Sequence, residues 1–218
     1  MNKAFLFDLN GTIIDDMAYH SKSWFDILNN DLAAGLTKAQ VDKEMYGKNS
    51  ELLERIFGKE AFTPQEIDHW SVEKEKRYQT AYREHMKLIN GLDSFLESAH
   101  KKGIPMAIGS AAIPFNISFI LDGLDLHKYF PVIVSADDVV LSKPDPETFL
   151  KGAAQLNIDP AHCIVFEDAP KGVEAAANAG MKAVVITTMH TAEEFSKYDN
   201  IIGFIEDYTD PLLEQLLH

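Results

Sequence analysis

The sequence predicts an α/β fold, in which a parallel β-sheet is covered by helices on both faces and an all-helical domain follows the first strand. Three observations lead to this prediction. Short, almost continuously apolar segments alternate with helical patterns, polar residues directly follow several of them, and one long interval has no strand pattern. Apolar runs of this kind are typical of strands buried on both faces. Their alternation with helices indicates parallel strands joined by right-handed crossovers.

The apolar segments predict strands at residues 4–7, 105–108, 131–134, 163–166, 183–186 and 201–205. Between them, helices are expected at residues 91–102, 146–156 and 170–179. Pro146 and Pro170 stand where two of these helices begin, and Gly103 and Gly180 follow two helix ends. Proline at the start and glycine after the end is the usual asymmetry of helix boundaries.

From residue 15 to residue 88 only helical patterns occur, at residues 16–28, 37–45, 50–57 and 64–87. A crossover between parallel strands needs far fewer residues. We therefore expect a core domain at residues 1–14 and 89–218 and a helical cap domain at residues 15–88. The second connection carries Asn90-Gly91, a helix breaker. With two adjacent connections, the inserted domain could move as a lid.

The 218 residues include 46% hydrophobic residues and carry a net charge of −14, from 20 Lys and Arg against 34 Asp and Glu. This charge argues against nucleic acids and anionic membranes as partners, because their phosphates would be repelled. A small phosphorylated substrate remains compatible with local cations and a metal. The single cysteine, Cys163, excludes a disulfide framework and a cysteine-based zinc site. With no signal-peptide pattern and no long apolar run, a cytoplasmic protein is expected.

Polar side chains follow four predicted strands where each one ends: Asp8, Asn10, Thr12, Ser110, Lys143, Glu167 and Asp168. The carboxyl ends of parallel strands form the ligand crevice of such sheets. Alone, each residue has a simpler explanation, such as a turn for Asp8 or a helix cap for Asp168. Together, clustered carboxylates need a cation, and oxygen ligands favour Mg²⁺. A lysine and a hydroxyl beside them suit a phosphoryl group.

The segments FLFDLNGTIID, AIGSA, SKPDPETF and VFEDAPKGVEAAANAGM resemble, in this order, the four motifs of the haloacid dehalogenase superfamily. The resemblance is to its β-phosphoglucomutase-like branch and covers essentially the whole chain. It implies a Rossmann-like parallel sheet core with an inserted all-helical cap domain. It also implies a small phosphorylated metabolite as the substrate and, as is common in the branch, a monomer.

The resemblance implies a role for each core motif residue. Asp8 would be the nucleophile that forms an aspartyl-phosphate, and Asn10 occupies the general acid/base position. Mg²⁺ would be held by Asp8, by the backbone carbonyl of Asn10, and by Glu167 and Asp168. Ser110 and Lys143 would hold phosphoryl oxygens, with Thr12 and Ala111 as further substrate contacts. In the cap, the implied substrate contacts are His20, Trp24, Gly47, Lys48 and Lys74. For Trp24, a place in the cap core explains the residue equally well.

Position 10 departs from the pattern of the branch, which usually has a second aspartate there. An amide can form hydrogen bonds but cannot exchange a proton in the useful pH range. An engineered Asp-to-Asn exchange that traps a complex would explain Asn10, and so would natural chemistry of another kind. The other motif positions are intact, and this favours the engineered exchange. Metal binding should survive, since position 10 would contribute its backbone carbonyl.

Within the branch, threonine at position 12 favours hydrolysis, because mutases commonly have valine there. The stretch Gly47-Lys48-Asn49-Ser50 also lacks the arginine with which a mutase cap holds a second phosphate. A Mg²⁺-dependent phosphatase for a small phosphorylated metabolite, such as a sugar phosphate, is therefore the first hypothesis. A phosphohexomutase is the second, because His20, Trp24 and Lys74 resemble mutase residues. Carbon–halogen hydrolysis and a non-catalytic binding protein that lost turnover through Asn10 are more distant alternatives.

Overall fold

The computed structural model describes residues 3–218 and divides into two compact units. One unit contains the chain up to Asp15 together with Lys87–His218, and the other is Asp16–Met86. We call them the core unit and the cap unit. Among the described residues, no helix has both the length and the apolar character needed to cross a membrane.

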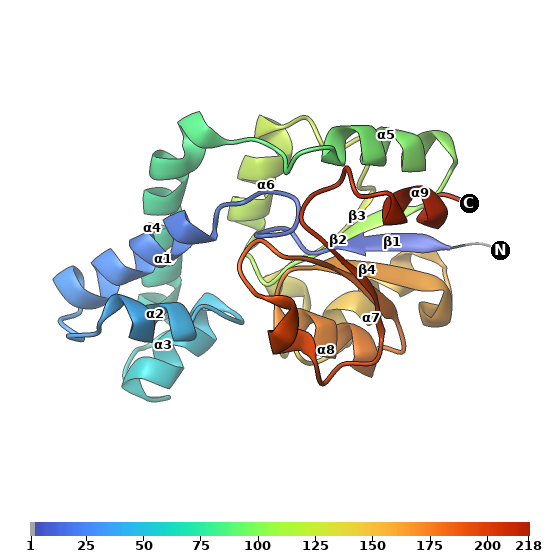
Figure 1. Cartoon of the computed structure of the whole chain (residues 1–218). Coiled ribbons are helices and arrows are strands. Elements are labelled where there is room, and N and C mark those ends of the chain that lie inside the picture. The colour runs from blue at the N-terminus through green and yellow to red at the C-terminus, as the bar shows by residue number, and fades with distance from the viewer. Residues whose placement is uncertain (1–2) are drawn as a thin grey trace. The chain divides into compact units, whose positions relative to one another are not determined.

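The core unit contains a six-stranded parallel sheet with the strand order β3-β2-β1-β4-β5-β6 (Figure 1). The strands are β1 (Ala4–Phe7), β2 (Met106–Gly109), β3 (Val132–Val134), β4 (Cys163–Glu167), β5 (Lys182–Ile186) and β6 (Ile201–Ile205). β1 pairs with β2 on one side and with β4 on the other. The connection order reverses at β1, and this is where ligands bind in sheets of this topology. The α/β prediction is confirmed.

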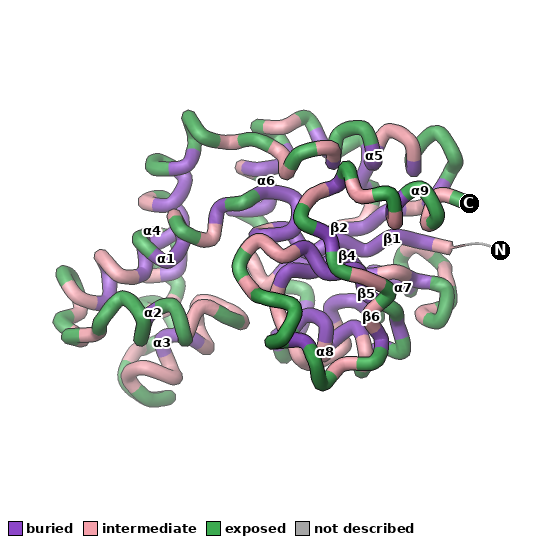
Figure 2. Tube along the Cα trace, in the orientation of Figure 1, coloured by how far each residue is buried: buried purple, intermediate pink, exposed green. Residues whose placement is uncertain are grey.

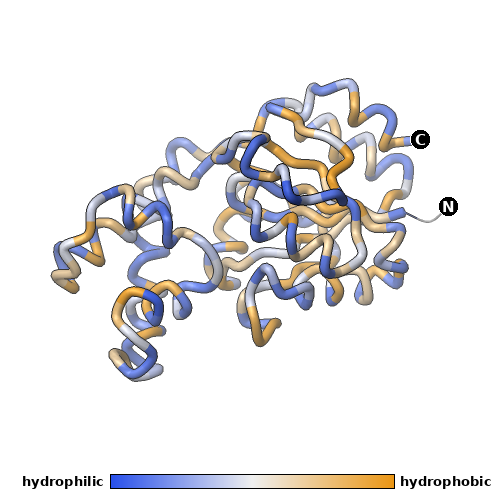
Figure 3. The backbone as a smooth tube through the Cα atoms, turned by 60° about the horizontal axis from the view of Figure 1, so that its bottom comes forward, coloured by the Kyte–Doolittle hydropathy of each residue, from blue (hydrophilic) through white to orange (hydrophobic). Residues whose placement is uncertain are grey.

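Helices cover both faces of this sheet (Figure 1). On one face, α7 (Glu147–Leu156) and α8 (Pro170–Asn178) pack against small and branched side chains such as Leu6 and Val165. On the other face, α5 (Leu92–Lys101) contributes Phe95, which stacks on Phe5 with ring centroids 5.5 Å apart. α9 (Leu212–Leu216) lies on this same side. The central strands β1, β2 and β4 are almost completely buried, whereas the edge strands β3 and β6 are only partly buried (Figures 2 and 3).

Besides the short α9 (Leu212–Leu216), the sequence prediction missed one longer helix of the core unit, α6 (Pro114–Gly123). Its segment is apolar almost throughout, so helical and strand periodicities cannot be separated there. Two predicted strands, β1 and β6, have the observed bounds, and the other four differ by one residue at one or both ends. For example, β2 begins at Met106 rather than at Pro105, and β4 includes Glu167.

The cap unit contains α1 (Met17–Asp26), α2 (Lys38–Lys43), α3 (Asn49–Phe57) and α4 (Pro64–Tyr82). Thr37 and Thr63 cap the starts of α2 and α4, where their side chains accept hydrogen bonds from the amides of Gln40 and Glu66. The side chains of Gln40 and Glu66 in turn accept from the amides of Thr37 and Thr63, which completes two capping boxes. The predicted first helix, residues 16–28, instead passes into a π-helical turn at Ile27–Asp31. The predicted helix at residues 64–87 ends at Tyr82, and a 3₁₀ turn follows. The cap core consists of buried side chains from α1, the turn, α2 and α3: Trp24, Ile27, Leu28, Val41, Leu52 and Leu53.

Candidate functional site

The centre of the site is the Lys143 side chain, which lies between two carboxylates at the carboxyl ends of β1 and β4. Its Nζ donates to Asp8 Oδ1 at 2.6 Å and to Glu167 Oε1 at 2.8 Å. All three residues are buried, and the Lys143 residue is 8% exposed. Asp8 follows β1 directly, and its amide donates to the Phe166 carbonyl of β4. The strand-end pattern therefore brings the predicted nucleophile and lysine into direct contact.

Burial and the charges at this site shift the pKa values of Lys143 and Asp168. Burial opposes the charge of Lys143, but Asp8 and Glu167 outweigh burial and raise the pKa of Lys143 above its usual range. Burial, Glu167 and Asp8 together raise the pKa of Asp168 well above its usual range. Lys143 is therefore a cation, but its single charge does not neutralise the three neighbouring acids. The site has an excess of negative charge that a further cation would relieve.

Two glycines allow the carboxylates to approach the backbone closely. Gly11 has a φ of 82°, and a Cβ there would lie 2.1 Å from Asp168 Oδ2. A Cβ on Gly172, at the start of α8, would lie 1.7 Å from Glu167 Oε1. The other oxygen of Glu167 accepts a hydrogen bond from the Ala169 amide at 2.8 Å. No other residue fits these positions without moving an acid.

The remaining predicted core residues lie on neighbouring strand ends. Thr12 is fully buried, and its hydroxyl is 3.5 Å from Asp168 Oδ1. Ser110 directly follows β2, is 2% exposed, and accepts a hydrogen bond from the Ala112 amide at 3.1 Å. Ala111 lies between them in the chain and is half-buried. Asn10 is also half-buried and pairs through its backbone with Ile14.

The described residues contain no group of three or more His, Cys, Asp or Glu side chains arranged to hold a metal ion. Mg²⁺, however, usually takes only one or two carboxylates and completes its shell with water and substrate phosphate. Asp8 and Asp168 supply hard oxygen ligands, and the raised pKa of Asp168 reflects its burial beside the negative charges of Glu167 and Asp8. The donor set therefore fits Mg²⁺ bound by few side chains.

In the cap unit, His20 and Lys74 belong to a buried polar network. His20 Nε2 lies 3.1 Å from Asp16 Oδ2, and Lys74 Nζ lies 2.6 Å from His20 Nδ1. Lys74 also pairs with Glu75 at 2.9 Å, and the Tyr78 hydroxyl donates to Asp16 Oδ2 at 2.5 Å. The His20 ring stacks on the Tyr78 ring with centroids 3.8 Å apart. We name this set, Asp16, His20, Lys74, Glu75 and Tyr78, the cap network.

The other predicted cap residues have different surroundings. Trp24 is 1% exposed and belongs to the cap core. This is one of the two explanations that the sequence analysis gave for the residue. Gly47 has a φ of 75°, and Lys48 precedes α3, where its amide donates to Glu51. Both are half-buried. Among the described cap residues that were predicted, His20 and Lys74 form a direct polar contact.

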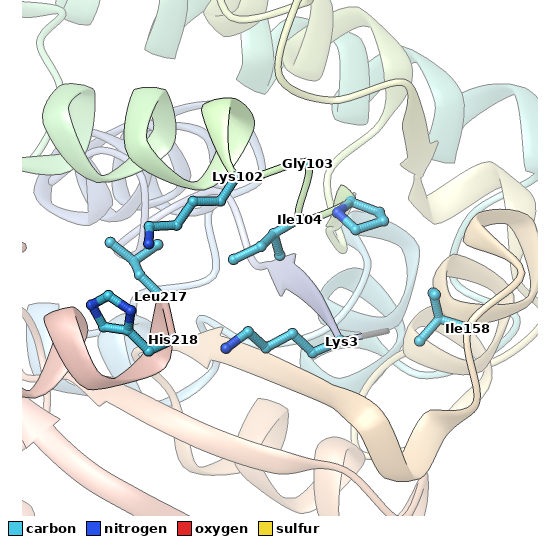
Figure 4. Close-up of a pocket in the computed structure, with 8 residues that line it drawn as sticks. Lys3, Lys102, Gly103, Ile104, Ile158, Leu217 and His218 are labelled. Carbon is cyan, nitrogen blue, oxygen red and sulfur yellow. The ribbon is translucent and has the colours of Figure 1, made fainter. Parts of the chain in front are cut away.

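A separate pocket of about 510 Å³ lies at the opposite, amino ends of the strands (Figure 4). Lys3, Lys102 and His218 line it together with apolar side chains such as Ile104 and Ile158. Lys3 directly precedes β1, and Pro105 directly precedes β2. None of the predicted site residues lines this pocket.

The sequence analysis missed several residues that contact the predicted ones. In the core unit, the Thr188 hydroxyl donates to the Gly11 carbonyl at 2.7 Å and the Tyr208 hydroxyl to the Thr12 carbonyl at 3.0 Å. No local pattern marks either residue. In the cap unit, Asp16 and Glu75 were missed. Asp16 stands four residues before His20, and this spacing, which places two side chains on one helix face, could have revealed it.

The chain is similar to known proteins of one hydrolase family. The family model described as "Haloacid dehalogenase-like hydrolase" matches residues 5–186. The Escherichia coli fructose-1-phosphate phosphatase YqaB is 32% identical over 186 residues, which span 82% of this chain and 93% of that protein. The β-phosphoglucomutase of Bacillus subtilis is 31% identical over 84% of this chain and 82% of its own length.

The fold also matches solved structures. A family IA, variant 3 hydrolase of the same superfamily from Entamoeba histolytica superposes with a TM-score of 0.86. It is 26% identical and covers 99% of both chains. The relatives thus include both a phosphatase and a phosphomutase.

Proposed function

The chain belongs to the haloacid dehalogenase-like hydrolase family, and on that premise we propose that it is a Mg²⁺-dependent phosphatase for a small phosphorylated metabolite such as a sugar phosphate. The observation that carries the proposal is the contact of Lys143 with both Asp8 and Glu167 beside Asp168. A nucleophile held by a buried cation, next to further carboxylates, suits transfer of an anionic phosphoryl group. The names of the fructose-1-phosphate phosphatase and of other relatives support a sugar phosphate.

In the proposed reaction, an Asp8 carboxylate oxygen attacks phosphorus, and the bond between phosphorus and the leaving oxygen breaks. The product is an aspartyl-phosphate on Asp8 and an alkoxide, which must take up a proton. Water then attacks phosphorus and gives up a proton to solvent, the bond between phosphorus and the Asp8 oxygen breaks, and inorganic phosphate and the Asp8 carboxylate result. Lys143 would stay close to Asp8 and the transferred oxygens through both steps. Mg²⁺, when bound by Asp8, Asp168 and the Asn10 carbonyl, would neutralise charge on the phosphoryl oxygens.

Asn10 can supply neither the proton for the leaving oxygen nor a base for the water. We therefore propose that the chain turns over slowly, with solvent as the proton source. A general acid/base contributes about 10²- to 10⁴-fold to the rate. The Asn10→Asp variant should gain a factor in this range, because it restores a group that can exchange protons.

The test is Mg²⁺-dependent phosphate release from a panel containing fructose 1-phosphate, β-glucose 1-phosphate and hexitol phosphates. The unaltered chain, Asn10→Asp, and Asn10→Asp combined with Asp8→Asn are compared. Asn157→Asp at an exposed site serves as the control for the added charge. Phosphate release about 10²- to 10⁴-fold faster in Asn10→Asp than in the unaltered chain, lost again with Asp8→Asn, supports the proposal. If no form releases phosphate although all bind Mg²⁺ and inorganic phosphate, the proposal is wrong.

A phosphohexomutase is the second candidate, favoured by the 31% identity to the Bacillus subtilis β-phosphoglucomutase. The same panel separates the two functions. A mutase converts β-glucose 1-phosphate into an isomeric sugar phosphate without stoichiometric phosphate release, whereas a phosphatase releases one phosphate per sugar. Thr12 and the absence of arginine from residues 47–50 support the phosphatase.

A further inference from the structure

The loop that follows the nucleophile is held by three segments that lie far from it in the sequence. Consecutive carbonyl groups of Gly11, Thr12 and Ile13 each accept one hydrogen bond. The donors are the Thr188 hydroxyl at 2.7 Å, the Tyr208 hydroxyl at 3.0 Å and the Ile89 amide at 3.0 Å. All belong to the core unit. The loop is therefore fixed from outside as well as through its own bonds, such as Ile13 N–H to the Leu9 carbonyl at 2.9 Å.

Tyr208 is itself held firmly in place. It is 5% exposed, and its ring lies beside Phe95 and Phe166, with centroid distances of 5.8 and 5.9 Å. Its amide donates to the Asn90 carbonyl at 2.9 Å. A Cβ on Gly91 would lie 2.8 Å from the Tyr208 carbonyl carbon, so this backbone approach needs glycine. The position of the hydroxyl is thus determined by both the ring and the backbone.

The contact links Tyr208 to the acids of the site in two ways. Thr12, whose carbonyl accepts from Tyr208, places its own hydroxyl 3.5 Å from Asp168 Oδ1. Phe166, against which the Tyr208 ring lies, stacks on Phe7 at 4.5 Å, and Phe7 directly precedes Asp8. Displacement of Tyr208 would therefore disturb the segments that carry Asp8 and Asp168.

We infer that Tyr208 and Thr188 are positioning residues of the phosphoryl-transfer site: their hydroxyls fix the backbone of residues 11 and 12 and thereby the geometry of Asp8 and Asp168. The inference rests on the proposed function for its effect on turnover, but its structural part can be measured without substrate. Neither hydroxyl needs to touch the substrate. Small displacements of a reacting group are costly, because the rate depends steeply on the geometry of attack.

The variants are Tyr208→Phe and Thr188→Val, which remove only the hydroxyl or exchange it for a methyl group. Tyr129→Phe is the matched control, because its hydroxyl donates to Glu97 at 2.9 Å, and Tyr129, like Tyr208, is mostly buried in the core unit. Amide hydrogen exchange of residues 9–14 is measured in the protein without ligand. We expect exchange at Gly11 and Ile13 to be about tenfold faster in Tyr208→Phe and in Thr188→Val, with β3 unchanged. Tyr129→Phe should leave the loop unchanged.

Turnover is then measured in the more active of the two position-10 forms. Tyr208→Phe should lower kcat about tenfold with little change in KM, because positioning affects the reacting atoms more than substrate binding. The double variant should show less than the product of the two single effects, since both hydroxyls act on one loop. Unchanged loop exchange in Tyr208→Phe would overturn the inference, as would equal kcat in Tyr208→Phe and Tyr129→Phe. Absence of turnover in every form would refute the proposed function and leave the exchange result to decide the positioning role.

Discussion

At the scale of single residues, the site depends on one buried cation that forms ion pairs with two carboxylates. Lys143 donates to Asp8 and Glu167, and no more than 12% of any of these three side chains is exposed. Removing one member of a buried ion pair leaves the partner charge desolvated and uncompensated, which costs about 3–5 kcal/mol. Loss of the Lys143 charge would leave two carboxylates uncompensated, and one of them, Asp8, is the group proposed to attack phosphorus.

We therefore predict that Lys143→Met lowers the free energy of unfolding by about 3–5 kcal/mol in the presence of EDTA. Methionine keeps most of the unbranched chain, so the loss measures mainly the ammonium group, which also lies 4.7 Å from the centroid of the Phe149 ring. Turnover should fall by at least about 100-fold, as for the loss of a charged group that stabilises the transition state. Urea unfolding and phosphate release measure the two effects.

Lys151→Met is the control for this substitution. Lys151 pairs with Glu147 on the surface, where its side chain is 42% exposed, and such pairs contribute at most about 1 kcal/mol. Equal losses in the two variants would contradict the special role of Lys143.

Much of the core site could be predicted because Asp8 and Asp168 directly follow strands, Glu167 is the last residue of β4, and Lys143 lies in the connection from β3 to α7. An apolar run fixes where a strand ends, and a parallel sheet brings Asp8, Lys143, Glu167 and Asp168 to one edge. Tyr208 and Thr188 could not be found in this way. Their hydroxyls meet loop carbonyls only through the three-dimensional path of the chain after β5 and β6, which no local pattern encodes.

At the scale of elements, the cap network joins α1 to α4. Asp16 directly precedes α1, and Tyr78 lies near the end of α4. The buried Tyr78 hydroxyl donates to the Asp16 carboxylate, and burial and Asp16 both raise the pKa of Tyr78, so the tyrosine stays a donor throughout the accessible pH range. A hydrogen bond to a charged group contributes about 1.5–3 kcal/mol.

Tyr78→Phe should therefore destabilise the cap unit by about 1.5–3 kcal/mol. Both tryptophans of the chain, Trp24 and Trp70, lie in the cap unit, so their fluorescence during urea unfolding reports on this unit. Tyr198→Phe is the control, since its hydroxyl donates to Glu174 in the core unit. The expected result is a lower fluorescence midpoint for Tyr78→Phe alone. An unchanged midpoint would show that the hydrogen bond adds no stability.

The elements themselves were largely predictable from periodicity and from boundary residues such as Pro64 and Pro170. The π-helical turn at Ile27–Asp31 was not, because its extra residue leaves the apolar pattern of the helix almost unchanged. The end of α4 was placed five residues too late for a related reason: residues 83–87 contain neither proline nor glycine to mark a helix end.

At the scale of the whole molecule, the pH dependence of stability should reveal the unfavourable burial and mutual repulsion of the site carboxylates. Because the pKa of Asp168 is raised in the folded state, the folded chain binds a proton that the unfolded chain has lost. Stability from this residue is complete below the unfolded pKa of about 3.9 and declines as the pH rises towards the folded value. Many surface carboxylates with lowered pKa, such as Asp42 and Asp138, act in the opposite direction.

Comparison with Asp168→Asn isolates this contribution, because the amide resembles the protonated acid. In EDTA, we predict that the free energy of unfolding of Asp168→Asn rises relative to the unaltered chain as the pH increases from 4 to 7, by up to about 1.4 kcal/mol per pH unit. Mg²⁺ should reduce the difference at neutral pH by stabilising only the unaltered chain. Urea titrations at several pH values measure the free energy of unfolding of both proteins. A difference between them that stays constant with pH would contradict the raised pKa of Asp168.

The central place of β1 in the sheet has a consequence for synthesis on the ribosome. β1 is made first, but its neighbours begin only at Met106 and Cys163. The entire cap unit, Asp16–Met86, is translated in the interval. Since domains generally fold as they emerge, the helical insertion can complete its own core while the strand that leads to Asp8 still lacks both hydrogen-bonding partners. The nucleophile therefore reaches its final place late, after the insertion behind it has been built.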